Sequence, residues 1–240
     1  MRAIGMTHKG KIRNINQDNY YLSNEKIGSL PNLYIIADGM GGHKAGEYAS
    51  KYAVEEFLNY VKKQENMCIV DIFTKGINYI NELIYNKSLN NECYHGMGTT
   101  FIASCVKNHK LYVANVGDSR LYLINDKIKQ ITKDHSLVGE MLRCGKLTKE
   151  QVKDHPDKNI ITRAVGADNT VISDIFTLDI TDDEFILMCT DGLTNMLEDD
   201  KIHQVIEKEM SLQKKLDELI TLALNNGGTD NIAAVLIKGE

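Results

Sequence analysis

The sequence has no excess of basic residues, which argues against a nucleic-acid-binding protein. Its 240 residues include 28 lysines and arginines and 33 aspartates and glutamates, so the formal net charge is −5. Domains that bind nucleic acids usually concentrate positive charge on one face or along one helix. We therefore expect no nucleic-acid partner.

Long apolar segments are also missing. No apolar stretch approaches the ~20 residues that cross a bilayer as a helix. The first residues, MRAIGMTHKGK, lack the apolar centre of a secretory signal peptide. We expect a cytoplasmic protein with no membrane association.

Cysteine and histidine patterns exclude several kinds of site. There is no C-x-x-C pair, no H-x-x-x-H pair that would suggest zinc, and no arginine six positions after a cysteine, as a cysteine-dependent phosphatase loop requires. The odd number and wide spacing of the cysteines favour a reduced, cytosolic compartment. We expect small buried thiols at Cys68, Cys93, Cys105, Cys144 and Cys189.

The residues that are present indicate an α+β fold. With 42 % hydrophobic and 25 % charged residues the chain is typical of globular proteins, and we expect one domain over residues 1–240. Apolar, strand-like runs cluster in the middle, while helical periodicity marks 43–63, 69–86, 199–209 and 211–226. This order favours a β-sandwich flanked by helices. We predict strands at 19–23, 33–37, 100–106, 111–116, 120–125, 172–178, 184–189 and 231–237.

Residues 139–166 are more polar than the rest and have only short-range periodicity. Thr148 and Gln151 fit a capping box at the start of a short helix, which Pro156 would end. We predict a small excursion from the core.

Aspartates stand at the ends of several predicted core strands. In LYIIADGMGGH an apolar run leads to Asp38, followed by Gly39, and Asp118, Asp191 and Asp230 stand at similar boundaries. A single Asp-Gly is usually a turn. Several carboxylates at one rim of a sandwich would repel one another, and a hard cation such as Mg²⁺ or Mn²⁺ would neutralise them. Such a set suits a two-metal site, with ions about 4 Å apart that activate water for attack on phosphorus.

A phosphate would also need a positive partner. Arg13 lies five residues before Asp18 in RNINQDN, and a guanidinium can hold two phosphate oxygens. The alternative for an isolated arginine is a solvated surface charge.

Taken together, the motifs resemble those of the bacterial metal-dependent serine/threonine protein phosphatases, the type 2C or PPM family. The resemblance extends along essentially the whole chain. It is carried in order by RNINQD (13–18), DGMGGH (38–43), GTT (98–100), NVGDSR (115–120), DHS (134–136), ITRAVG (161–166), TDGL (190–193) and TDN (229–231).

The resemblance implies a four-layer α-β-β-α fold, built on a sandwich of two antiparallel sheets, with residues 139–166 as a flap. It implies that Asp38 bridges two Mn²⁺ or Mg²⁺ ions, with the Gly39 carbonyl on one, and Asp191 and Asp230 on the other. Asp118 and Asp191 would hold a possible third ion.

The family's activity is hydrolysis of phosphoserine and phosphothreonine by a water that bridges the metals. By the same resemblance, Arg13 would hold the substrate phosphate and Asp18 would orient water. The partners would be phosphorylated proteins, among them a serine/threonine kinase whose action in signalling the enzyme opposes, and we expect a monomer.

The sequence departs from the family pattern at two positions. Met40 stands where some relatives carry a histidine proposed as the general acid, so His43 and metal-associated water remain alternative proton donors. Gln17 stands where such relatives carry glutamate.

Three other functions fit the sequence less well. A nuclease would also use carboxylates and two metals, but the acidic balance argues against it. A regulator without catalytic activity would be expected to lack Asp38, Asp191 or Asp230, and all three are present. A nucleotide loop at 39–42 lacks the Lys-Ser/Thr and the Rossmann spacing.

Overall fold

The computed structural model describes residues 1–42, 44–148, 151–152 and 155–239. Its strands are Arg2–His8 (β1), Asp18–Ser23 (β2), Leu33–Met40 (β3), Gly98–Thr99 (β4), Phe101–Lys107 (β5), Lys110–Val116 (β6), Arg120–Ile124 (β7), Ile128–Gln130 (β8), Asp174–Asp179 (β9), Phe185–Cys189 (β10) and Ile232–Lys238 (β11). Its helices are Ala45–Lys62 (α1), Ile69–Asn90 (α2), Glu92–Tyr94 (η1, a 3-10 helix), Leu137–Arg143 (α3), Asp191–Thr194 (α5), Asp199–Ile206 (α6) and Leu212–Asn225 (α7).

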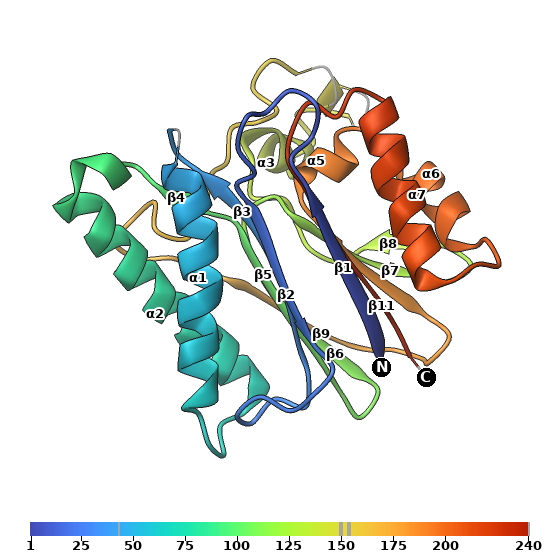
Figure 1. Ribbon diagram of the computed structural model, residues 1–240, viewed down its shortest axis with the longest axis horizontal. Helices are drawn as coiled ribbons and strands as arrows, with labels where there is room; N and C mark the ends of the chain where they lie inside the picture. The colour runs from blue at the N-terminus through green and yellow to red at the C-terminus, as the bar shows by residue number, and fades with distance from the viewer. Residues whose placement is uncertain (43, 149–150, 153–154, 240) are drawn as a thin grey trace.

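Two antiparallel sheets lie between two layers of helices, as the sequence motifs predict (Figure 1). One sheet has the strand order β1-β11-β10-β7-β8, and the other β2-β3-β5-β6-β9, with β4 paired to β3. Helices α1 and α2 cover the second sheet, and α6 and α7 cover the first. The α+β sandwich is therefore confirmed.

Three hydrophobic clusters fill the spaces between the four layers. Along β3, Tyr34 and Ile36 face the other sheet, while Ile35 faces the helices. In β11, Val235 faces the other sheet and Leu236 faces the helices. Because both faces of these strands are covered, their sequences are continuously apolar, which is why they could be recognised as strands.

Local signals also match the structure. The Ser211 hydroxyl accepts from the Lys214 amide at the start of α7. The Thr148 amide donates to Gln151 Oε1 at 2.8 Å and the Gln151 amide donates to Thr148 Oγ1 at 3.4 Å, as a capping box requires. A tight turn at Asn125–Lys127 joins β7 to β8.

Two sequence predictions are wrong. Strand β3 does not end at Ala37: it continues through Asp38 and Gly39 to Met40, because Asp38 pairs with Asp18 on β2 and Gly39 pairs with Thr99 on β4. The cysteines are not all buried, since only Cys105 and Cys189 lie in the core. All five are free thiols.

No helix in the described ranges is both long enough and apolar enough to span a bilayer. The two chain ends lie side by side at one end of the sandwich (Figure 1).

Candidate active site

The predicted aspartates gather at the end of the sandwich opposite the chain ends. Asp18 and Asp38 are directly opposite each other in the β2–β3 register. Asp191 begins α5 just after β10, and Asp118 follows β6. Asp230 precedes β11 and is held at the site by its neighbour Asn231. Thus both sheets contribute carboxylates to one rim, as expected from their positions at strand ends.

Burial and mutual repulsion raise the pKa values of these carboxyl groups. Burial, then the charges of Asp191 and Asp230, raise the pKa of Asp18 to about 8. Burial and Asp191 likewise raise the pKa of Asp118 to about 8, and burial and Asp230 raise that of Asp191 to about 6. The pKa of Asp38 is raised well above its ordinary value by burial and by Asp18. The cluster carries more negative charge than its surroundings can neutralise.

These carboxyl groups suit hard divalent cations. The charges of Asp18 and Asp191 both raise the pKa of Asp38, so these carboxyl groups repel one another when they are ionised. The buried Oδ1 of Asp118 has no hydrogen-bond partner among the described residues. A divalent cation would offset this repulsion and satisfy such an oxygen.

The carboxylates do not form a closed cage. In the described part of the chain, no three histidine, cysteine or acidic side chains are grouped so that together they could hold a metal ion. The arrangement is one of neighbouring pairs around Asp38. Mg²⁺ is usually held by one or two carboxylates and several waters, so neighbouring pairs match its coordination better than a cage would.

The backbone of Asp38 is fixed by two threonines. The Asp38 amide donates to Thr100 Oγ1 at 2.9 Å, and the Asp38 carbonyl accepts from Thr99 Oγ1 at 2.8 Å. The following residue, Gly39, is packed closely: a Cβ atom there would lie 2.0 Å from the carbonyl oxygen of Gly46. These contacts explain why the strand continues through the Asp-Gly pair.

Arg13 lies at the site, but it already has an acidic partner. Its Nη2 donates to Asp230 Oδ2 at 2.7 Å, and 51 % of its side chain is exposed. This ion pair offsets part of the negative charge at Asp230. Because the guanidinium is half exposed and has five N–H donors, it can bind a phosphate as well.

Asn231 fixes the segment that carries Arg13. Its Oδ1 accepts from the Gln17 amide at 2.8 Å, and its Nδ2 donates to the carbonyls of Lys9 and Ile15 at 2.8 and 2.9 Å. On its other side, Gly192 is in such close contact that a Cβ atom would lie 1.8 Å from the Asn231 oxygen. The side-chain amide of Asn231 thus fixes the segment around Arg13, while its backbone packs against Gly192, the residue after Asp191.

An arginine–aspartate ion pair that the sequence did not predict lies behind the carboxylates. Arg120 forms a bidentate contact with Asp134 (Nε to Oδ1 3.2 Å, Nη2 to Oδ2 2.7 Å) and donates to the Tyr122 hydroxyl through Nη1 at 3.2 Å. Its charge lowers the pKa values of Asp118 and Asp191, opposing the larger effect of burial. Arg120 lies within the recognised motif 115–120, but no local pattern identified its partner.

Two histidines, His135 and His43, lie in the recognised motifs. His135 has a structural environment, because Nδ1 accepts from the Gly117 amide at 3.1 Å and burial lowers its pKa. Its Nε2 lies 3.3 Å from Asp174 Oδ2, which is close enough for an ion pair but is not aligned as a hydrogen bond. His43, the candidate acid, lies outside the described residues.

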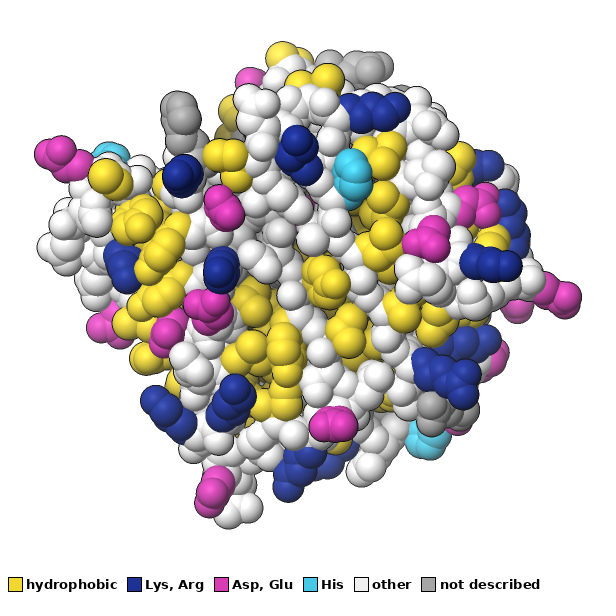
Figure 2. Space-filling model, viewed as in Figure 1, with side chains coloured by type: hydrophobic (Ala, Val, Ile, Leu, Met, Phe, Trp, Pro, Cys, Tyr) yellow, Lys and Arg dark blue, Asp and Glu magenta, His cyan; other side chains and the backbone are white. Residues whose placement is uncertain are grey.

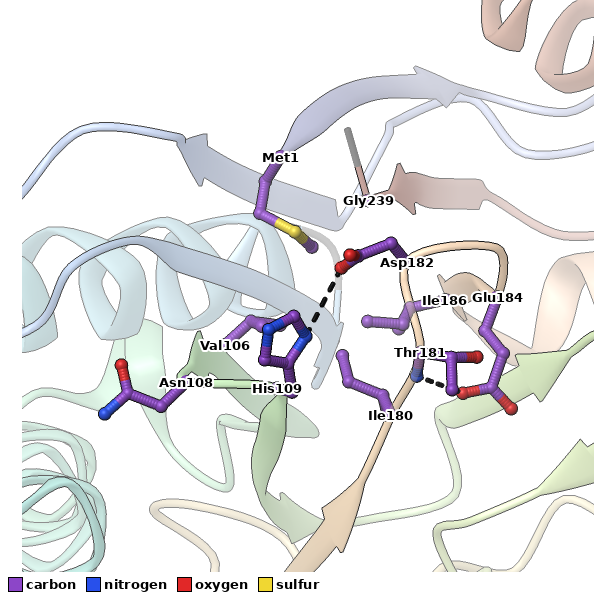
Figure 3. Close-up of a pocket in the computed structure, with 10 residues that line it drawn as sticks. All are labelled: Met1, Val106, Asn108, His109, Ile180, Thr181, Asp182, Glu184, Ile186 and Gly239. Atoms are coloured by element: carbon purple, nitrogen blue, oxygen red, sulfur yellow. Dashed lines mark hydrogen bonds and ion pairs between the residues drawn. The ribbon is translucent and has the colours of Figure 1, made fainter.

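A separate pocket of about 240 Å³ lies at the opposite end of the sandwich, near the chain ends (Figure 3). Val106, Ile180 and Ile186 line its apolar part, and His109 and Asp182 pair across its rim at 3.4 Å. It contains none of the candidate site residues, so we do not connect it with phosphate chemistry.

Comparison with known proteins gives the same family that the motifs suggest. The sequence model described as protein phosphatase 2C matches residues 6–236. The chain is 37 % identical to the serine/threonine phosphatase Stp of Listeria innocua over 99 % of this chain and 96 % of that protein. It is 35 % identical to protein phosphatase PhpP of Streptococcus pneumoniae, covering 97 % of this chain and 95 % of that protein.

Solved structures agree with the sequence comparison. The crystal structure of the serine/threonine phosphatase Stp1 from Staphylococcus aureus has a TM-score of 0.93 and 34 % identity, covering 99 % of this chain and 94 % of that one. The serine/threonine phosphatase PstP/Ppp of Mycobacterium tuberculosis has a TM-score of 0.89 and 29 % identity, covering 100 % of this chain and 98 % of that one.

Proposed function

This chain belongs to the protein phosphatase 2C family and is a serine/threonine phosphatase, and from this premise we infer that divalent metal ions drive its reaction. The observation that carries this proposal is the buried carboxylate cluster around Asp38, whose pKa values are raised by burial and mutual repulsion. We further propose that residues 1–240 form one phosphatase domain, which the family match over 6–236 supports.

Asp38, Asp191 and Asp230 would hold two Mn²⁺ or Mg²⁺ ions, with the Gly39 carbonyl as a further ligand. Asp118, whose Oδ1 has no partner among the described residues, would join Asp191 at a third ion. Ions bound there would neutralise the carboxylates, activate a water and stabilise charge developing on the phosphoryl group.

The chain's own residues would position the substrate and the attacking water. Arg13 would bind the phosphate oxygens with the guanidinium donors that Asp230 does not use. Asp18, opposite Asp38 in the β2–β3 register, would accept a hydrogen bond from the attacking water and so orient it. Met40 cannot protonate the leaving alkoxide, so a water beside Asp18 would supply that proton if His43 does not.

The partners would be phosphorylated cytoplasmic proteins, among them a serine/threonine kinase and its substrates. A nuclease activity is disfavoured by charge: on the face drawn in Figure 2, lysines and arginines are interspersed with acidic residues and form no continuous stripe.

Substrate class can be tested with matched ligands. We expect phosphate release from phosphothreonine and phosphoserine peptides in the presence of Mn²⁺, and none from single-stranded DNA. Cleavage of the DNA at a rate comparable to that of the peptides would show that the proposed substrate class is wrong.

A further inference from the structure

Thr190 has an unusual hydrogen-bonding role for a residue at the start of a helix. It precedes α5 as the N-cap, where a threonine hydroxyl normally accepts a bond from an amide of the first turn. Here the side chain makes no such bond. Its Oγ1 instead donates to Asp18 Oδ2 at 2.7 Å. The hydroxyl therefore bonds to a carboxylate of the cluster and not to the first turn of the helix.

The neighbouring backbone fixes the direction of this hydroxyl. Thr190 Oγ1 accepts a hydrogen bond from the Ala233 amide at 2.9 Å, so one lone pair is occupied. Its single proton can point to Asp18 Oδ2 at 2.7 Å or to the Ala233 carbonyl at 3.4 Å. The shorter contact, to Asp18, is the stronger one. Thr190 is fully buried, so water does not compete for the proton.

This contact joins the two sheets at the site. Asp18 begins β2 in one sheet, while Thr190 follows β10 and is bonded to β11 in the other. Asp18 Oδ2 is thereby anchored to the opposite sheet, leaving Oδ1 as the oxygen not committed to Thr190. A carboxylate with one oxygen fixed in this way has little freedom to rotate.

We propose that Thr190 is a positioning residue that holds the Asp18 carboxylate in the orientation needed to direct the attacking water. This inference rests on the proposed function, because it assumes that Asp18 orients that water. Thr190 would not touch the substrate. Its removal should therefore affect turnover more than substrate binding.

The test compares Thr190→Val, Thr190→Ser and Asp18→Ala on a phosphothreonine peptide with saturating Mn²⁺. Valine keeps the shape of threonine but lacks the hydroxyl, so kcat should fall about ten- to a hundredfold, the range expected for a hydrogen bond to a charged group. KM should stay within about twofold, because the lost interaction is used in the transition state. Thr190→Ser, which retains the hydroxyl, should recover most of the lost kcat.

Two further measurements separate positioning from folding. In an Asp18→Ala background, Thr190→Val should cause little additional loss of kcat, because the two residues act as a unit. Thr132→Val removes an equally buried hydroxyl, which accepts from the Leu121 amide, and serves as a control for general destabilisation. If Thr190→Val does not fold, as judged by thermal melting, Thr190→Ala takes its place.

The outcomes are distinguishable. If Asp18→Ala leaves kcat unchanged, the proposed role of Asp18 is wrong, and the inference about Thr190 is overturned with it. If Asp18→Ala reduces kcat strongly but Thr190→Val does not, the proposed role of Asp18 is supported and the positioning role of Thr190 is wrong. Equal losses from Thr190→Val in the wild-type and Asp18→Ala backgrounds would also overturn the inference.

Discussion

Replacing Asp118 with asparagine should stabilise the protein when no metal is present. Burial, then the charges of Asp191 and Asp134, raise the pKa of Asp118 from 3.8 to about 8. An aspartate with a raised pKa binds its proton more tightly in the folded state than in the unfolded state, so it destabilises the fold as pH rises from about 4 to about 8. Asparagine has nearly the same shape and no charge, and should relieve this cost.

The size of the effect follows from the pKa difference. Each pKa unit corresponds to about 1.36 kcal/mol. An aspartate that stays protonated in the fold but ionises in the unfolded chain at pH 7 therefore costs at most roughly 4 kcal/mol of unfolding free energy. If relaxation and solvent recover half of that, Asp118→Asn gains about 2 kcal/mol, or roughly 4–8 °C in Tm for a chain of this size. The gain should shrink at pH 5, because that pH is much closer to the unfolded-state pKa of 3.8, so ionisation stabilises the unfolded chain far less than at pH 7.

Thermal unfolding followed by circular dichroism in chelator, at pH 5 and pH 7, measures this directly. Asp126→Asn is the matched control, because Asp126 is exposed in the β7–β8 turn and its charge is solvated. With saturating Mn²⁺ the advantage of Asp118→Asn should disappear, since the cation compensates the charge. An Asp118→Asn protein that melts at or below the wild-type temperature in chelator at pH 7 would refute this reasoning.

Three further predictions concern single residues. Arg13→Ala should raise KM for a phosphopeptide by at least about tenfold through loss of charge-assisted phosphate bonds, and an unchanged KM would make Arg13 a surface charge. His43→Ala should reduce kcat on a phosphothreonine peptide and on p-nitrophenyl phosphate to similar extents, because water can supply the proton; a loss of about a hundredfold confined to the peptide would identify His43 as the acid. Gly192→Ala should destabilise the fold by about 1–3 kcal/mol in thermal melts, because its Cβ would lie 1.8 Å from the Asn231 oxygen. Gly42→Ala, whose Cβ would meet nothing within 4 Å, is its control, and equal melting temperatures would contradict the packing argument.

The sequence predicted most of the core because the central strands are apolar on both faces. It did not predict β1, Arg2–His8, whose residues are mostly half-buried and include Gly5. That glycine is required by a distant contact, because a Cβ atom there would lie 2.4 Å from the Tyr20 ring. A requirement of this kind depends on a neighbouring strand, so no local pattern reveals it.

The sequence also predicted part of the candidate site. Aspartates at strand ends identified the cluster, since strand ends of one sandwich meet at a common rim. Their supporting contacts were not predictable. Thr190 and Asn231 stand next to motif aspartates, but Thr190 bonds to Asp18, 172 residues away, and Asn231 bonds to Gln17, 214 residues away. The pairing of Arg13 with Asp230 is equally non-local.

We propose above all that catalysis depends on metal bound by Asp38. Measuring Mn²⁺ binding to chelator-treated protein tests this most directly. Equilibrium dialysis and phosphothreonine-peptide hydrolysis should be followed on the same samples of wild type, Asp38→Asn and the control Asp126→Asn. We predict that activity rises with bound Mn²⁺ in the wild type and in Asp126→Asn, and that Asp38→Asn loses both tight Mn²⁺ binding and nearly all turnover. Full turnover by wild-type protein that contains no metal, or by Asp38→Asn, would contradict the account.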